Sequence, residues 1–161
     1  MVRGASITHD FISEEEEAYL VRRFKDLKGI TSGNGLYQLR YGTPVYAQKL
    51  VSNVVPEYLQ VFCDRLALKG MVARSPRHVT VNHYTVGSSI GPHIDKASCG
   101  KVITILSLLS ETAMVLSRGE ERVEVVLPRR SLIQLAGESR YDWMHEVPQV
   151  GSVRYSVVFR D

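Results

Sequence analysis

The chain has 161 residues, 44% of them hydrophobic, and a formal net charge of +3 at pH 7. This length favours one compact domain, and the small positive charge is compatible with an anionic partner without requiring one. Two cysteines and no run of about 18 apolar residues exclude a disulfide-rich scaffold and a membrane-spanning helix. We expect a single domain over residues 1–161, monomeric, without membrane contact, in the cytoplasm or the nucleus.

Two helices are predicted in the first half of the chain. Ser13 and Glu16 have the spacing of a capping box, and apolar residues then recur at helical spacing up to Gly29. The run of four glutamates is therefore interpreted as the start of a helix rather than as a binding patch. Pro56 is suited to the start of a second helix, whose apolar stripe ends at Gly70.

The second half of the chain is predicted to be β-rich. Six apolar or alternating segments follow Pro76, with turn-forming residues between them. They are HVTVNHYTV, KVITILSLL, AMVLS, VEVVL, SLIQLAG and VRYSVVFR. The segment LYQLRYG, before the second helix, is a further short strand. Two helices and about seven strands indicate an α+β fold, with the helices on one side of a sandwich or barrel.

The segment GPHIDK places His93 and Asp95 two residues apart. In an extended segment both side chains face the same way, so the pair can offer two ligands to one metal, although such a triplet also occurs by chance. His145 is the best candidate for a third ligand, in the arrangement of two histidines and one carboxylate that holds Fe(II). A surface position for His145 stays open, and the chain has three other histidines: His9, His78 and His83.

The C-terminal segment RYSVVFR carries two arginines and a hydroxyl group on one face: Arg154, Ser156 and Arg160. A solvent-facing strand is one explanation. If this face instead lines a barrel, the guanidinium groups need anionic partners. A small dicarboxylate would supply them, because arginine binds carboxylates bidentately. Asn82 and Tyr84 share one face of another strand and can add hydrogen bonds.

These motifs, in this order, resemble the AlkB family of Fe(II)/2-oxoglutarate dioxygenases. N-x-Y, H-x-D, a distant His and R-x-S-x-x-F-R extend from Val79 to the end, about half of the chain. The resemblance implies a double-stranded β-helix, or jelly roll, with N-terminal helices packed on one sheet. It implies Fe(II) bound by His93, Asp95 and His145. It implies 2-oxoglutarate bound by Asn82, Tyr84, Arg154, Ser156 and Arg160, with Arg154 on the distal carboxylate.

The resemblance also implies oxidative demethylation or hydroxylation of a nucleic acid, with RNA or tRNA favoured over DNA. LPRRSLIQLAGESRY and LRYGTPVY are similar to the branch that hydroxylates a modified wobble uridine of tRNA. Members of the family that repair alkylated DNA bases have acidic residues just after H-x-D that can recognise the base. Residues 96–99 contain no acid, so the resemblance disfavours base repair. CGKVITILSLLS resembles members suspected of acting on protein, so a protein side chain remains an alternative. Arg129, Arg130 and Arg140 are candidate phosphate contacts, although a solvated turn is the favoured explanation for the first two.

Overall fold

Two antiparallel sheets face each other in the computed structural model, which describes residues 1–161. The larger sheet has seven strands, in the spatial order β1 (Ala5–Thr8), β9 (Leu132–Ala136), β6 (Val102–Leu108), β11 (Arg154–Arg160), β4 (His78–Tyr84), β3 (Leu36–Gly42) and β2 (Ile30–Thr31). The smaller sheet has four strands, in the order β5 (Ile90–His93), β10 (Met144–Val147), β7 (Thr112–Arg118) and β8 (Glu121–Leu127). The predicted jelly roll is confirmed.

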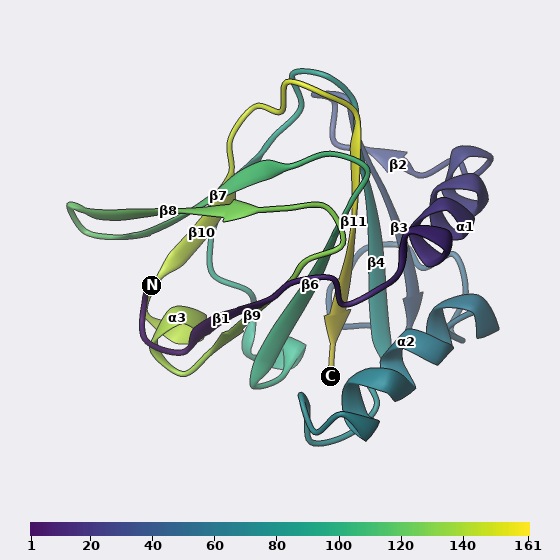
Figure 1. Cartoon of the computed structure of the whole chain (residues 1–161), viewed down its shortest axis with the longest axis horizontal. Helices are drawn as coiled ribbons and strands as arrows, with labels where there is room; N and C mark the ends of the chain where they lie inside the picture. The colour runs from purple at the N-terminus through teal and green to yellow at the C-terminus, as the bar shows by residue number, and fades with distance from the viewer.

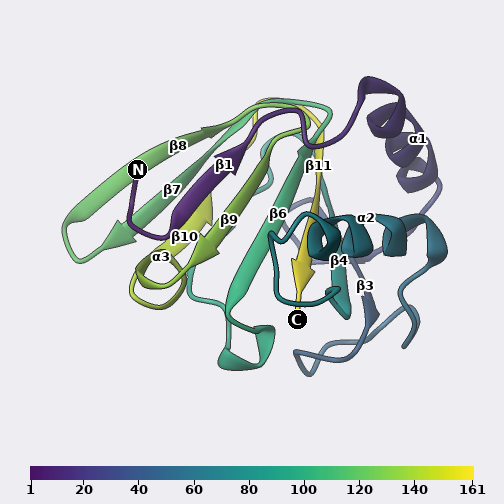
Figure 2. The same cartoon turned by 60° about the horizontal axis from the view of Figure 1, so that its bottom comes forward.

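The two long helices, α1 (Glu14–Lys25) and α2 (Glu57–Leu68), cover the outer face of the larger sheet (Figure 1 and Figure 2). The capping box is present: the Ser13 hydroxyl accepts the Glu16 backbone N–H at 3.1 Å, and the Glu16 carboxylate accepts the Ser13 N–H at 3.0 Å. The short α3 (Glu138–Tyr141) and a 3-10 turn (Ala97–Cys99) complete the helical segments. No helix has the length and apolar character needed to cross a bilayer.

Period-2 alternation divides the core into two layers. On β11, Tyr155 and Phe159 point outward and pack with Phe24 of α1 and the apolar residues of α2. Val158 points inward and packs between the sheets, with residues such as Met114 of β7. Along β4 and β11 the inward positions become polar, so the space between the sheets is only partly filled by apolar side chains.

The predicted element order is wrong in one respect, because a strand precedes the first helix. β1 pairs antiparallel with β9, with Ala5 opposite Leu135. The short strands β5 and β10 were also not predicted as strands. Each of these three has four residues, too few for a hydrophobic period to be recognised, and their pairing with distant strands decides their conformation.

Glu17 is an exception to the interpretation of the glutamate run as a solvated helix start. It is 2% exposed, accepts the Leu109 backbone N–H at 2.9 Å and pairs with Arg129 at 2.6 Å. Burial alone would raise the pKa of Glu17, but the bonds from Arg129 and Leu109 lower it below its usual value. The carboxylate therefore joins α1 to the segment after β6 and to the β8–β9 turn.

Replacing Glu17 with alanine is expected to lower the free energy of unfolding by about 3 kcal/mol, because it leaves a buried N–H and an arginine without their partner. Urea denaturation measures this loss. Glu15 is exposed in the same helical turn, so Glu15→Ala should change stability by less than about 0.5 kcal/mol. Equal effects of the two substitutions would contradict a specific role for Glu17.

Candidate active site

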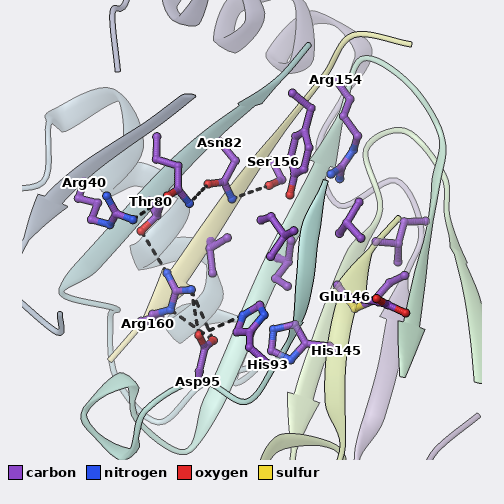
Figure 3. Close-up of a pocket in the computed structure, with 18 of the residues that line it drawn as sticks. Arg40, Thr80, Asn82, His93, Asp95, His145, Glu146, Arg154, Ser156 and Arg160 are labelled. Atoms are coloured by element: carbon purple, nitrogen blue, oxygen red, sulfur yellow. Dashed lines mark hydrogen bonds and ion pairs between the residues drawn. The ribbon is translucent and has the colours of Figure 1, made fainter. Parts of the chain in front are cut away.

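A pocket of about 260 Å³ lies between the two sheets (Figure 3). All three predicted metal ligands and all five predicted cosubstrate residues line it. The larger sheet contributes the inward positions of β3, β4 and β11, and the smaller sheet contributes β5 and β10. Residues as far apart in the sequence as Gln38 and Arg160 therefore meet at one site.

The three candidate metal ligands come together at one end of the pocket. His93 of β5 and His145 of β10 are directly opposite each other in adjacent antiparallel strands, with ring centroids 4.2 Å apart. Asp95 follows β5, and its Oδ1 lies 3.7 Å from His93 Nε2. One ligand atom from each residue lies within 4.8 Å of those from the other two. Two imidazoles and one carboxylate in this arrangement fit Fe(II).

Two of these residues have pKa values suited to metal binding. Burial, and then the neighbouring His93, lower the pKa of His145 to about 4, so its imidazole is neutral at pH 7. Burial alone would raise the pKa of Asp95, but the Arg160 guanidinium and the Tyr46 hydroxyl lower it to about 2. A neutral imidazole and an ionised carboxylate are the forms that coordinate a metal.

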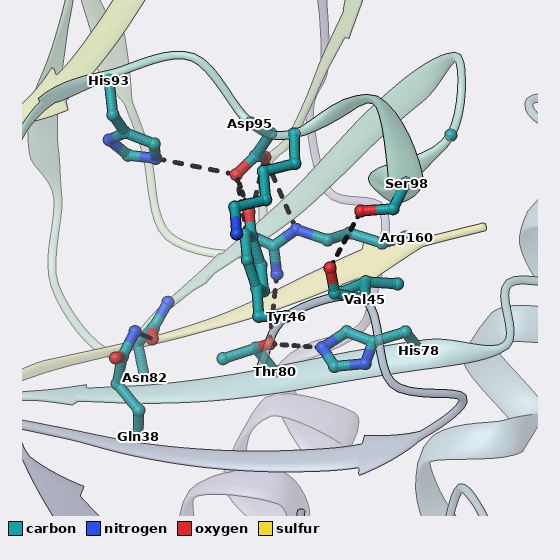
Figure 4. A network of polar contacts seen from close by, with 12 residues as sticks. Gln38, Val45, Tyr46, His78, Thr80, Asn82, His93, Asp95, Ser98 and Arg160 are labelled. Atoms are coloured by element: carbon teal, nitrogen blue, oxygen red, sulfur yellow. Dashed lines mark hydrogen bonds and ion pairs between the residues drawn. The ribbon is translucent and has the colours of Figure 1, made fainter. Parts of the chain in front are cut away.

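The Asp95 carboxylate is held by two side chains (Figure 4). Arg160 Nη2 lies 3.3 Å from Asp95 Oδ1, and the Tyr46 hydroxyl donates a hydrogen bond to the same oxygen. The expectation that Arg160 lies near the metal end of the site agrees with this contact. Tyr46 ends the segment LRYGTPVY, but no contact with the metal ligands was predicted for it, because it lies in a loop without a periodic pattern.

Arg140 fixes the backbone that follows Asp95. It is 2% exposed and donates hydrogen bonds to the carbonyl oxygens of Asp95 and Lys96, each at 2.7 Å. The idea that Arg140 contacts a phosphate is therefore wrong, because its donors are used inside the chain. Arg129 and Arg130, the other two candidates, pair with Glu17 at 2.6 and 3.6 Å.

Arg154 occupies the other end of the pocket and is 1% exposed. Its Nη2 donates to Ser107 Oγ at 2.9 Å and its guanidinium lies 4.5 Å from the centre of the Tyr84 ring. Its Nε and Nη1 are buried without a hydrogen-bond partner. A buried cation with two free donors is costly unless an anion binds it. This observation excludes the solvent-facing strand and fits the carboxylate of 2-oxoglutarate.

A row of polar side chains crosses three strands beside Arg154. Asn82 Nδ2 donates to Ser156 Oγ at 3.0 Å, Gln38 Nε2 donates to Asn82 Oδ1 at 2.8 Å, and Arg40 Nη2 donates to Gln38 Oε1 at 2.7 Å. Asn82 and Ser156 were predicted. Gln38 and Arg40 were missed, although their alternation with Leu39 in LYQLRYG was the signal that places them on the inner face.

The other three histidines lie away from the triad. His9 is exposed, and His83 faces outward and stacks on Tyr155 at 4.5 Å between ring centroids. His78 is 1% exposed, with Nδ1 2.8 Å from the Thr43 carbonyl oxygen and Nε2 3.0 Å from Thr80 Oγ1. Because a carbonyl only accepts, Nδ1 carries the proton and Nε2 accepts from Thr80. His78 is therefore bonded as a neutral imidazole.

Acid is expected to destabilise the metal-free protein through His78. Burial lowers the pKa of His78 from 6.5 to about 4, so between these values the unfolded chain binds more protons and stability falls as the pH falls. Between pH 6.5 and 5 this amounts to about 2 kcal/mol. Urea denaturation at several pH values measures the stability lost between pH 6.5 and 5. In His78→Asn this loss should be about 2 kcal/mol smaller than in the wild type, whereas His9→Asn should lose as much as the wild type. An identical slope in all three proteins would contradict the assignment.

Comparison with known proteins agrees with this geometry. The model of the 2OG-Fe(II) oxygenase superfamily matches residues 30–159. Protein L905 of Acanthamoeba polyphaga mimivirus is 26% identical over 159 residues, covering 91% of this chain and 74% of that protein. A Xenopus tropicalis relative, named tRNA (carboxymethyluridine(34)-5-O)-methyltransferase alkbh8, is 30% identical over 156 residues and 89% of this chain. This match spans only a quarter of the Xenopus protein, 25%.

The fold is also found among solved structures. That of OsALKBH1 superposes with a TM-score of 0.74 at 16% identity, covering 100% of this chain and 99% of that one. At this identity the likeness concerns the fold. Together with the family match and the two imidazoles and one carboxylate that meet in the pocket, it completes the identification. The chain belongs to the 2OG-Fe(II) oxygenase superfamily and is an AlkB-like dioxygenase whose cofactors are Fe(II) and 2-oxoglutarate.

Proposed function

We propose that the two ends of the pocket bind the two cofactors. The Fe(II) ligands in this proposal are His93, Asp95 and His145. The 2-oxoglutarate residues are Asn82, Tyr84, Arg154, Ser156 and Arg160, with Arg154 on the distal carboxylate. The observation that carries the proposal is the unpartnered, buried guanidinium of Arg154, in the same pocket as a cluster of metal-ligating side chains.

Fe(II) and 2-oxoglutarate, with O2, supply the oxidation of a C–H group to an alcohol, while 2-oxoglutarate becomes succinate and CO2. The chain contributes position and environment. Arg160 and Tyr46 hold the Asp95 carboxylate in one orientation. Apolar side chains such as Met114 and Val158 line the pocket and exclude water from the reacting groups. If the hydroxylated carbon is an N-methyl group, the product loses formaldehyde, which amounts to demethylation.

For the substrate we propose a nucleic acid, with RNA favoured over DNA. The support is the similarity to proteins whose name gives tRNA as their substrate, together with the tRNA-branch motifs in this sequence. The absence of an acid in residues 96–99 is a further reason to favour RNA modification over repair of alkylated DNA. A protein side chain is the alternative.

Succinate release by the iron-loaded protein tests this proposal, with no addition, bulk tRNA, or single-stranded DNA carrying methylated bases. Stimulation by tRNA alone is expected. Stimulation by methylated DNA alone would make base repair the function instead. Iron-dependent turnover that neither polymer stimulates would reject a nucleic acid substrate and direct the search to proteins.

A further inference from the structure

Arg40 is a buried pocket residue without a counter-charge. It lies on the inner face of β3, opposite Thr80 of β4, and is 9% exposed (Figure 3). Its single side-chain hydrogen bond runs to Gln38 at 2.7 Å, and no carboxylate pairs with it. Unlike those of Arg154, its other guanidinium nitrogens are not fully enclosed and stay accessible to a ligand. Burial, and then the charge of Arg160, lower the pKa of Arg40 from its usual value, which reflects the cost of this position.

Two of the other charged groups of the pocket are paired within the chain, and Arg154 is assigned to the distal carboxylate of 2-oxoglutarate. Arg160 forms an ion pair with Asp95, and Glu146 forms one with Arg122 at 2.7 Å. Arg40 is thus the guanidinium group of the pocket to which neither an ion pair within the chain nor the proposed placement of 2-oxoglutarate assigns an anion. A guanidinium group in a pocket of low dielectric constant is a strong site for an anion.

The position of Arg40 also separates it from Arg154, the residue proposed to hold the distal carboxylate of 2-oxoglutarate. Arg154 lies on β11, two strands away from β3. It is opposite Tyr84 of β4, and Tyr84 is in turn opposite Leu36 of β3. Arg40 is four residues farther along β3, so its backbone is on the order of 15 Å from that of Arg154. Arg40 instead borders the loop after β3, whose Tyr46 and Gln48 line the same pocket.

We propose that Arg40 binds a singly charged oxyanion of the primary substrate. This inference rests on the proposed function, in which the substrate is an RNA. Two groups of an RNA substrate are singly charged oxyanions of this kind: a carboxylate on the base that enters the pocket, and a phosphodiester next to that base. Both offer two oxygens to the paired N–H groups of a guanidinium. Arg40 then sets specificity: it favours substrates with an oxyanion close to the oxidised carbon over neutral analogues.

The first test requires no RNA. Zn(II) replaces Fe(II), 2-oxoglutarate is saturating, and the protein carries isotope-labelled arginine. The NMR signal of the Arg40 guanidinium is identified as the one missing in Arg40→Lys. Acetate or dimethyl phosphate should shift this signal saturably, with half-saturation on the order of 10 mM, and should leave the Arg154 signal in place. No saturable shift with either ion would overturn the proposal.

The second test distinguishes the sources of the oxyanion. RNA oligonucleotides carry a 5-carboxymethyl group on the target uridine, its neutral methyl ester, or the carboxymethyl group next to a neutral methylphosphonate. Their binding to the Zn(II)- and 2-oxoglutarate-loaded protein is followed by fluorescence anisotropy. If Arg40 binds one of these oxyanions, neutralising that oxyanion in the RNA should weaken binding to the wild-type protein about 10- to 100-fold. Arg22→Gln, an exposed control, should show the same loss, whereas Arg40→Gln should not.

Loss of affinity with the ester identifies a carboxylate, and loss with the methylphosphonate identifies a phosphodiester. If RNA binds but Arg40→Gln responds to both changes as the wild type does, Arg40 holds no substrate oxyanion. If the wild-type protein binds none of the RNAs, the proposed nucleic acid function fails, and the NMR titration alone still decides whether Arg40 is an oxyanion site.

Discussion

Replacing His93 with alanine is expected to reduce Fe(II)-dependent succinate formation to background, a loss of at least about 1000-fold, or about 4 kcal/mol in the activation barrier. The reason is that the proposed site has only three protein ligands, and an alanine leaves a carboxylate and one imidazole to hold the ion. His93 is half-buried at the end of β5, so its removal should leave the fold intact. Metal binding, followed with Co(II) absorption, should fall in parallel.

The exposed His9 provides the matched control, and His9→Ala should keep the wild-type rate and metal affinity. Circular dichroism and the melting temperature establish that both variants are folded. Wild-type turnover by folded His93→Ala would show that the metal lies elsewhere. A loss in both variants would point to a general effect of the substitutions.

Replacing Arg154 with methionine is expected to raise the 2-oxoglutarate concentration needed for half-maximal rate by about 100-fold. This corresponds to the loss of charge-assisted hydrogen bonds from a buried guanidinium to a carboxylate. The Kd for 2-oxoglutarate, measured by calorimetry on the Zn(II)-loaded protein, should rise by a similar factor. Lysine at the same position should recover part of the affinity, because it keeps the charge but not the fork.

A second measurement separates binding from a structural role. Without 2-oxoglutarate, Arg154 is a buried charge with two free donors, so the cofactor-free methionine variant should be at least as stable as the wild type. Arg22→Ala, on the exposed side of α1, should change neither property. An unchanged requirement for 2-oxoglutarate in Arg154→Met would move the cosubstrate to another part of the pocket.

The sequence predicted which residues line the pocket better than it predicted the strands around them. Period-2 alternation places Asn82 with Tyr84, and Arg154 with Ser156, on one face each, and the register of β4 against β11 then aligns these faces. The meeting of His93 with His145 depends on the pairing of β5 with β10, and no local pattern encodes that contact. From the sequence, His145 was the best candidate for the third ligand, and the family resemblance agreed with that choice.

Residues missed from the sequence owe their roles to tertiary contacts. Glu17 belongs to a run of glutamates whose spacing indicates a helix start, and only the packing of α1 against Leu109 and Arg129 buries it. Arg140 was a plausible phosphate contact until the fold placed its guanidinium against the carbonyl of Asp95. Long polar side chains are the hardest to assign from sequence, since solvent, ion pairs and ligands all satisfy them.

The edge position of β5 has a consequence for the motions of the protein. β5 is four residues long, pairs only with β10, and its register with β10 is irregular between His145 and Val147. Such an edge opens locally at little cost, so amide hydrogens of Ile90 and His93 should exchange rapidly in ion-free protein. A coordinated ion would tie both strands together and slow that exchange. Loading the metal would thereby also make one wall of the pocket more rigid, so that the ion would act as a cross-link between two strands as well as a reactant centre.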